Sequence, residues 1–332
     1  MKFPWGGLLI LCSAGAAFSC AADAYPDGVG NDPGELAARK LKPPKDCSPD
    51  SCAARKRGKK KRCAPVCNDT PFAQAVPIAA LSLPNTGEGA HAVSSDGSVI
   101  LYQGRQQPAA FCAFDQHLMA LRQPAGDYAI TDIAPQLAGL GLAVQPAALS
   151  GDGSSIVFLS MDLRRYVLTS RTGTRIELAD SSAFDAINAA LPAGAHFSQL
   201  ALSGNGRIFV YDIAPASGTG IHLYESQRAS PSDAFPAGAP LPDELQSTWM
   251  TSGISYDGLT LFQTVDYFQT HIYSRASICD PFANPNAPAS PPSVGGAGFI
   301  WQVKPLGDCR TLIASCAPGG CANQDICIIQ KP

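Results

Sequence analysis

The 332-residue chain lacks the sequence motifs of several large enzyme classes. It contains no G-x-S-x-G nucleophile elbow and no H-E-x-x-H zinc motif, which argues against an α/β-hydrolase and a zinc metalloprotease. A P-loop and a G-x-G-x-x-G motif in dinucleotide-binding context are also absent, so nucleotide chemistry is not indicated. We therefore expect no cofactor.

Helical patterns and membrane-length apolar runs are scarce as well. After residue 68 no stretch shows helical periodicity, and 31 glycines and 28 prolines point to many turns, hence to strands rather than helices. The one long apolar run, residues 5–17, is too short and too rich in Gly and Ala for a convincing membrane span. A composition of 45% hydrophobic and 15% charged residues is nonetheless ordinary for a protein with a globular core.

The N-terminus has the pattern of a secretory signal peptide over residues 1–19, with Lys2 ahead of the apolar run. Residues 17–20, AFSC, also resemble a bacterial lipobox, although Ala17 replaces the usual Leu. Lipid attachment at Cys20 and plain secretion after cleavage are the two alternatives. Twelve cysteines suit an oxidising compartment. We expect an exported protein, located in the periplasm or at the outer membrane or cell surface, either lipid-anchored or secreted.

Residues 20–68 differ from the remainder of the chain. Residues 1–68 carry a net charge of +6 and residues 69–332 one of −9, and the segment shows no apolar periodicity, so we expect a disordered Cys/Lys-rich tether. Its basic run, residues 55–62, is either simply solvated or attracted to anionic lipids or cell-wall polymers, and export removes nucleic acid as a partner. Four cysteines bracket this run with a spacing that suits two nested disulfides better than a zinc knuckle: Cys47, Cys52, Cys63 and Cys67.

One fourteen-residue pattern occurs five times after residue 69. Its clearest copy, residues 147–160, reads AALSGDGSSIVFLS, which is a set of small residues, a Ser-Gly-Asp-Gly corner and an apolar run. The other copies are residues 91–104, 200–213, 252–265 and, more degraded, 303–316. The equivalent acidic or amide residues stand 56, 53, 52 and 51 positions apart: Asp96, Asp152, Asn205, Asp257 and Asp308. A fixed period of this size indicates a repeat architecture.

The corner residues have a structural explanation. Asp and Asn bond nearby backbone N–H groups, and the Gly that follows supplies a positive φ, so each corner joins two antiparallel strands. These glycines are Gly97, Gly153, Gly206 and Gly258. Three or four short strands per period match one blade of a β-propeller. We predict an all-β propeller of five four-stranded antiparallel blades, with six blades as the alternative.

The repeat resembles that of TolB-type β-propellers. The resemblance rests on the S-x-D-G turn before an apolar strand, a strand ending in Arg, a D-P-F-x-x-P linker at residues 280–285 and a Gly-Gly turn within residues 309–329. It covers residues 69–332 and implies the WD-like blade fold rather than a function. Since the first module starts with a linker strand and the last ends after a third strand, we expect the N-terminal strand to close the last blade.

No constellation of catalytic or metal-binding residues stands out. His117, His222 and His271 share one repeat position, so they should lie on different blades without a common metal site. His91 and His196 are expected to line the channel, and one carboxylate per corner is too few for calcium. The acids available to a channel glycosidase are candidates by number alone: Asp115, Asp132, Asp162, Asp212 and Asp266.

Six cysteines fall within the predicted propeller, and their pairing is open. Cys316 and Cys321 flank residues 317–320, so a disulfide between them would staple the last hairpin. Cys309 would join either Cys279 or Cys327. The pairing of Cys316 with Cys321 is our candidate disulfide.

The function that we expect is that of a non-catalytic interaction or scaffold module of the bacterial cell envelope. It would be a monomer that binds a protein or polysaccharide through one propeller face, where loops follow second strands and precede first strands. Trp and Arg are common hot spots, and this face carries the candidate anchors Arg105, Arg164, Trp249 and Trp301. The alternatives are a channel-site polysaccharide hydrolase or lyase and a structural envelope component without a discrete ligand.

Overall fold

The computed structural model describes most of residues 72–331. The described residues are 72–73, 75–82, 86–106, 116–179, 181–216, 221–246, 251–266, 269–283, 293–294, 299–307, 310–317 and 325–331. The predicted signal peptide, Cys20 and the tether lie outside them. So do Trp249, Asp308 and Cys321.

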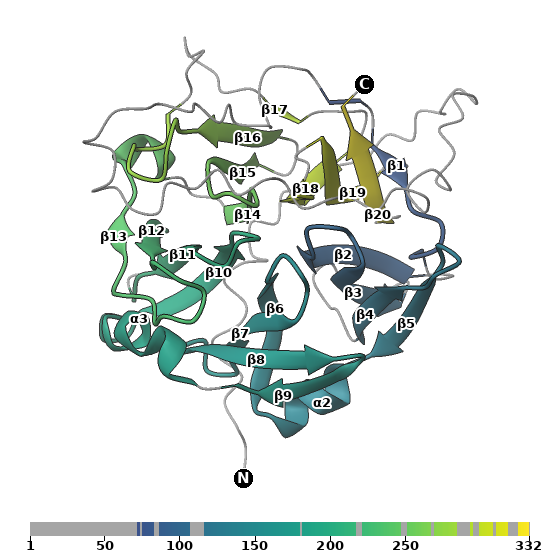
Figure 1. Ribbon diagram of the computed structural model, residues 1–332, viewed down its shortest axis with the longest axis horizontal. Helices are drawn as coiled ribbons and strands as arrows, with labels where there is room; N and C mark the ends of the chain where they lie inside the picture. The colour runs from purple at the N-terminus through teal and green to yellow at the C-terminus, as the bar shows by residue number, and fades with distance from the viewer. Residues whose placement is uncertain are drawn as a thin grey trace.

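The described strands form five sheets of four antiparallel strands each, arranged in a ring (Figure 1). Blade 1 holds β2 (Thr86–Val93), β3 (Val99–Gln106), β4 (Gln116–Arg122) and β5 (Tyr128–Asp132). Blade 2 holds β6 (Leu142–Leu149), β7 (Ser155–Ser160), β8 (Tyr166–Thr172) and β9 (Arg175–Leu178). Blade 3 holds β10 (His196–Leu202), β11 (Ile208–Ala214), β12 (His222–Gln227) and β13 (Ala239–Pro240).

The last two blades complete the ring. Blade 4 holds β14 (Thr251–Ile254), β15 (Thr260–Asp266), β16 (Gln269–Ser274) and β17 (Ser293–Val294). Blade 5 holds β18 (Phe299–Pro305), β19 (Thr311–Ala317), β20 (Asp325–Gln330) and, from the start of the described chain, β1 (Val76–Pro77). The chain is therefore a five-bladed β-propeller. The prediction of five blades, with an N-terminal strand closing the last one, is confirmed.

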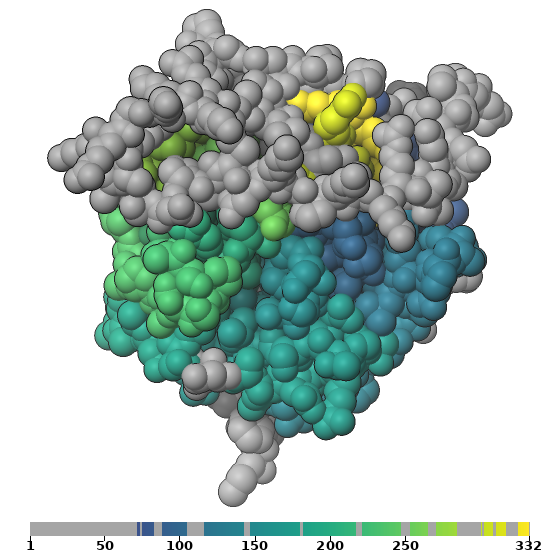
Figure 2. All heavy atoms as spheres, in the orientation of Figure 1, coloured from purple at the N-terminus to yellow at the C-terminus, as the bar shows by residue number. Residues whose placement is uncertain are grey.

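The inner strands of neighbouring blades contact one another in cyclic order around the centre: β2, β6, β10, β14 and β18. The space-filling view shows the same order at the surface, where colour passes from the blue of blade 1 through teal to the green of blade 3 (Figure 2). Each predicted corner lies between an inner strand and the second strand of the same blade. The corners therefore gather at one end of the ring, which we call the corner end, and the loops after the second strands lie at the opposite, open end.

Short helices connect some blades, which the sequence did not predict. These are α2 (Ala134–Gly139), η2 (Ser181–Phe184), α3 (Asp185–Ala189) and η3 (Asp243–Leu245). Each is too short for a helical period to stand out, and α2 and α3 each bury one apolar side chain, Leu137 and Ile187. Across the described residues, we find no helix with the length and apolar character needed to cross a membrane.

The hydrophobic core consists of clusters between adjacent blades. Second strands supply much of it: Ile156, Val157 and Phe158 of β7 are all at most 1% exposed, and Phe209 of β11 is fully buried. Consecutive apolar residues are expected where both faces of a sheet are covered. This confirms the interpretation of these runs as strands packed between blades.

An arginine at the end of a third strand fastens the corner of its own blade. The guanidinium groups of Arg228 and Arg275 donate to the carbonyl oxygens of the corner glycines, Gly206 at 2.6 Å and Gly258 at 2.8 Å. Each guanidinium also lies 4.1 Å from the centroid of a buried linker ring, Phe235 or Phe282. The aromatic linker and the terminal Arg of the repeat are therefore one interaction unit.

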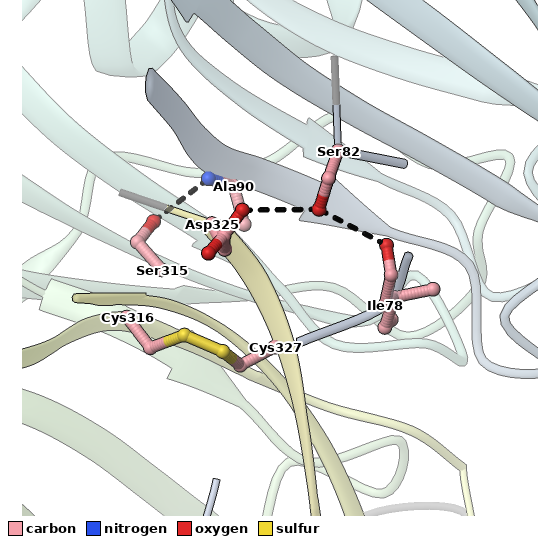
Figure 3. The surroundings of a disulfide bond; sticks show 7 residues. All are labelled: Ile78, Ser82, Ala90, Ser315, Cys316, Asp325 and Cys327. Atoms are coloured by element: carbon pink, nitrogen blue, oxygen red, sulfur yellow. Dashed lines mark hydrogen bonds between the residues drawn. A yellow bond between two sulfur atoms is a disulfide. The ribbon is translucent and has the colours of Figure 1, made fainter. Parts of the chain in front are cut away.

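The predicted Cys316–Cys321 disulfide is wrong, because Cys316 is bonded to Cys327 (Figure 3). β19 and β20 run antiparallel, with Cys316 opposite Asp325 and Ala314 opposite Cys327. This diagonal pairing places the two Cα atoms 5.9 Å apart, within the range that a disulfide spans. The bond also excludes the alternative Cys309–Cys327 pairing. Cys279 is disulfide-bonded too.

Candidate functional site

The four described corners share one geometry. Their glycines have φ between 67° and 75°: Gly97, Gly153, Gly206 and Gly258. In each corner the Ser hydroxyl donates to the Asp or Asn side chain and accepts from the backbone N–H five residues further on. In blade 3, Ser203 donates to Asn205 at 2.8 Å and accepts from the Ile208 N–H at 2.9 Å. At the fifth corner Leu306, fully buried, replaces that Ser. The predicted structural role of these residues is visible in each of the four.

A series of backbone hydrogen bonds links the corners from blade to blade. Gly307 N–H donates to Ser95 (2.7 Å), Ser95 N–H to Gly151 (2.8 Å), and Gly151 N–H to Gly204 (2.9 Å). Asn205 N–H donates to the Tyr256 carbonyl at 3.0 Å. All five blades contribute to this corner belt, so it ties the ring together at its centre.

The side chain of Tyr256 fills the centre of the corner belt. A Cβ atom on Gly204 would lie 2.4 Å from the Tyr256 ring and 2.4 Å from the Ser95 hydroxyl. A Cβ on Gly151 would lie 2.9 Å from the same ring. Groups of blades 1, 2, 3 and 4 therefore meet across the axis. The corner end is therefore closely packed at its centre among the described residues.

Every inner strand carries a β-bulge at nearly the same height above its corner. The pairing register shifts between Ala90 and Ala92 in β2 and between Trp301 and Lys304 in β18. The register also shifts in the other three inner strands, at residues 197–200 and 251–253 by one residue and at residues 143–147 by three. Bulges redirect side chains and release backbone N–H groups from the ladder. The residues between the paired positions include His91, Gln145, Ser198, Gln199, Ser252 and Gln302.

The structure shows how one bulge is satisfied at the contact between blades 5 and 1 (Figure 3). The hydroxyl of Ser315, on β19, accepts from the N–H of Ala90 at 2.8 Å and donates to Gln302 at 3.1 Å. Gln302 itself has a φ of 53°, a backbone conformation that residues other than Gly rarely adopt. Ser315 is therefore a bridge between blades. The same repeat position holds buried polar residues in three other blades: Gln103, Asp212 and Thr264.

The channel wall has an asymmetry that separates one blade from the other four. Four residues before each corner Asp or Asn, the inner strands carry Ala92, Ala148, Ala201, Gly253 and Lys304. All five line one small cavity of about 30 Å³, together with His91 and further inner-strand residues. Lys304 supplies the only amine among the lining residues.

Burial changes the protonation of both basic groups in this cavity. It lowers the pKa of Lys304 to about 8, although the Asp212 carboxylate acts in the opposite direction. Burial and the charge of Lys304 lower the pKa of His91 to about 3. His91 is therefore neutral at pH 7, and its Nε2 atom is buried without a hydrogen-bond partner among the described residues. Lysine burial disfavours the ammonium form by the same physics.

The predicted anchors of the binding face are only partly described. Arg164 is half-buried, and its guanidinium donates to the Ala195 carbonyl at 2.8 Å, so it links blades 2 and 3 at the open end. Arg105 lies near the end of β3 and Trp301 lies inside β18, where their side chains are not described. Trp249 lies outside the described residues. Trp301 is the third residue of the first strand of blade 5.

The acids named for a channel enzyme are dispersed. Asp132 ends the outer strand β5 and is exposed, accepting from the N–H of Ala134. Asp162 lies in the turn after β7 and binds Ser160. Asp212 is fully buried on β11, whereas Asp115 and the side chain of Asp266 are outside the description. Among the described residues no three His, Cys, Asp or Glu side chains come together as metal ligands.

Sequence reasoning missed Lys304, Gln302 and Ser315. A signal for Lys304 was present, because the five aligned copies carry Ala, Ala, Ala, Gly and Lys at one position. Gln302 and Ser315 gave no such signal, since a bulge depends on how blades pack and not on a residue type. His117, His222 and His271 lie on three different blades, as predicted.

Comparison with known proteins adds only distant structural similarities. No family model matches the chain, and no curated protein matches it. Similar solved structures include an α-L-arabinofuranosidase domain of Coprinopsis cinerea, at 10% identity over 81% of this chain and 98% of that one, with a TM-score of 0.48. A TolB of Agrobacterium tumefaciens is 13% identical over 74% and 83%, with a TM-score of 0.38. An oligogalacturonate lyase is 10% identical over 74% and 66%, with a TM-score of 0.36.

These neighbours include a TolB and enzymes alike, so we take no activity from them. The fold defines the class of this protein. It is a five-bladed β-propeller.

Proposed function

We propose that the protein is a non-catalytic interaction module of a bacterial cell envelope, which binds a protein or polysaccharide partner through its open end. The resemblance of its repeat to TolB-type propellers, the signal-peptide pattern of residues 1–19 and its twelve cysteines support export. Lipidation at Cys20 would hold it at a membrane. The basic tether would then separate the propeller from that surface.

The observation that carries this proposal is the difference between the two ends. At the corner end the four described copies repeat one turn, and the Tyr256 ring packs closely at the centre. At the open end the loops after the second strands differ in length and sequence, and the exposed side chain of Met161 (68%) follows β7 there. Surface that varies between otherwise equivalent copies is where binding specificity can reside.

The rival hydrolase or lyase has less support from the geometry. Glycoside hydrolysis requires two carboxyl groups facing each other across the scissile bond, roughly 5 to 9.5 Å apart. Asp132 and Asp162 lie on an outer strand and in a turn. Asp212 is fully buried, at the repeat position that Ser315 occupies in blade 5.

Capture of envelope partners by immobilised protein tests the proposal. The combined variant Arg105→Ala, Arg164→Ala and Trp249→Ala should reduce capture, while Arg175→Ala on the outer strand β9, whose side chain is 77% exposed, should not. Thermal unfolding must show that the triple variant folds, because Arg164 links two blades. Equal capture by all three proteins would contradict the proposal. Turnover of a polysaccharide panel by the wild type would favour the enzyme instead.

A further inference from the structure

Lys304 is an exception within its own repeat. The equivalent residues Ala92, Ala148, Ala201 and Gly253 are the smallest available, and all four line the cavity at the centre of the ring. Their small size is explained by close packing: a Cβ on Gly253 would lie 2.6 Å from the Val303 carbonyl oxygen of the neighbouring inner strand. Lys304 is the one long, cationic side chain among these five equivalent residues. Its position suggests a role that belongs to the cavity.

The cavity restricts how this amine meets solvent. Tyr256 and the corner belt pack closely at the corner end of this cavity. The side chain is partly exposed, and the cavity it lines is walled mostly by apolar inner-strand residues. Such surroundings disfavour an ammonium ion and favour the neutral amine, which is the nucleophilic form.

Two titratable groups interact electrostatically with Lys304. The Asp212 carboxylate on β11 favours the protonated amine, and His91 on β2 is neutral at pH 7. Burial outweighs the effect of Asp212. With a pKa of about 8, roughly a fifth of Lys304 is neutral at pH 7.4, against about one in a thousand for an ordinary lysine.

We propose that the ε-amine of Lys304 is the reactive group of a reversible covalent site for a small aldehyde or ketone in the central channel. The inference does not depend on the proposed envelope partner, since it concerns the channel and not the face around it. His91 lines the same cavity, and its Nε2 atom, which has no hydrogen-bond partner among the described residues, can bond a hydroxyl group of such a ligand.

The chemistry balances without an oxidant or a reductant. The lone pair of the neutral amine forms a C–N bond to the carbonyl carbon, and a proton passes from nitrogen to the former carbonyl oxygen, giving a carbinolamine. Loss of water, which carries away that oxygen and the second amine hydrogen, leaves an imine. Uptake of one proton from solvent gives the iminium ion. Addition of water reverses every step and releases the carbonyl compound.

A purely structural role is the competing explanation. Lys304 would then serve only to balance the buried charge of Asp212, and its amine would stay protonated and unreactive. Lys304→Arg separates the two roles, because arginine retains the positive charge but cannot form an imine. If the role is only structural, this variant should have nearly the same free energy of unfolding as the wild type.

Reductive trapping tests the proposal directly. The purified protein is treated briefly with dilute glycolaldehyde and cyanoborohydride at pH 7.4, and modified lysines are quantified by peptide mass spectrometry. We expect Lys304 to be labelled at least about tenfold faster than Lys331 or the lysines of residues 40–61. Denaturation in concentrated urea should abolish this preference. Labelling of Lys304 at or below the rate of the other lysines in folded protein would overturn the proposal.

The pH dependence supplies a second test that a merely accessible lysine would not pass. The labelling rate at Lys304 should level off above about pH 8, whereas for an ordinary lysine it keeps rising towards pH 10. Asp212→Asn removes the charge that favours the ammonium form, so the plateau should begin at lower pH. An unchanged profile in a folded Asp212→Asn variant, or a wild-type rate still rising at pH 10, would contradict the proposal. If Asp212→Asn fails to fold, the wild-type profile decides alone.

Discussion

The Nζ atom of Lys331 lies 4.8 Å above the centroid of the Phe72 ring. These residues stand near opposite ends of the described chain, yet they repeat the contact that joins Arg228 to Phe235 and Arg275 to Phe282 inside single modules. Phe72 is thus the linker aromatic of blade 5, delivered from the N-terminal side. Together with the pairing of β1 and β20, it shows that the ring closes by the same interaction that builds each blade.

Closure by Phe72 predicts a measurable loss of stability when the ring is removed. Phe72→Ala should lower the free energy of unfolding by about 1 to 2 kcal/mol, since the side chain is half-buried. Phe235→Ala, at a fully buried equivalent position, should cost about 3 to 5 kcal/mol. Denaturant unfolding measures both. A Phe72→Ala variant as stable as wild type would show that the N-terminal segment does not dock.

The close packing at the corner end predicts that replacing Gly204 lowers the free energy of unfolding. Gly204→Ala places a methyl group 2.4 Å from the Tyr256 ring, and such overpacking costs about 1 to 3 kcal/mol. Gly139→Ala in α2 is the matched control, because nothing lies within 4 Å of its added Cβ. In the background of Tyr256→Ala the cost of Gly204→Ala should shrink, so a double-mutant cycle reports the contact. Additive effects would argue against a tyrosine at the centre of the belt.

The corner aspartates predict a loss of stability in acid. Burial alone would raise the pKa of Asp152, but hydrogen bonds from Ser150 and Ser154 outweigh it and the net pKa is lowered. A lowered folded-state pKa gives stability that is present above the unfolded value, near 4, and is lost as the pH falls through the folded value. Asp152→Asn, which copies Asn205, should therefore flatten the dependence of Tm on pH between about 5 and 2. Identical profiles for both proteins would contradict this.

The observed disulfide predicts that removing it destabilises the last blade. Cys316 and Cys327 are buried in one cluster and separated by 11 positions, and a bond closing a loop of this size contributes about 2 to 3 kcal/mol. The double variant Cys316→Ala and Cys327→Ala should lose at least that much free energy of unfolding. Replacement of Cys321 alone should leave the Cys316–Cys327 bond intact by peptide mapping. A Cys316–Cys321 peptide in the native protein would disprove the assignment.

The architecture could be predicted from the sequence because it depends on local turn chemistry. Asp or Asn followed by Gly at a nearly constant spacing determined the number of corners, and Gly97, Gly153, Gly206 and Gly258 all adopt the positive φ expected of them. The apolar runs after the corners were recognisable as strands buried on both faces. The circular closure followed from counting strands at the two ends.

The candidate site could not be predicted in the same way, because it arises from packing between blades. The bulges at His91 and Gln302 follow no common residue pattern. Arg164 was expected as an exposed anchor, but its guanidinium is used by the Ala195 carbonyl of the next blade. Cys316 is bonded to Cys327 although Cys321 is closer to it in sequence, because the antiparallel register of the two strands brings Cys316 and Cys327 together.

The most direct test of the account compares the two ends of one strand. Met161 follows β7 at the open end and is 68% exposed, and Ser154 precedes β7 at the corner end and is also exposed. A photoreactive amino acid placed at either position, in protein mixed with envelope extract, reports which end meets a partner. We predict a specific cross-linked product from position 161 and none from position 154. Cross-linking from position 154 alone, or equally from both, would contradict the claim that the protein binds through its open end.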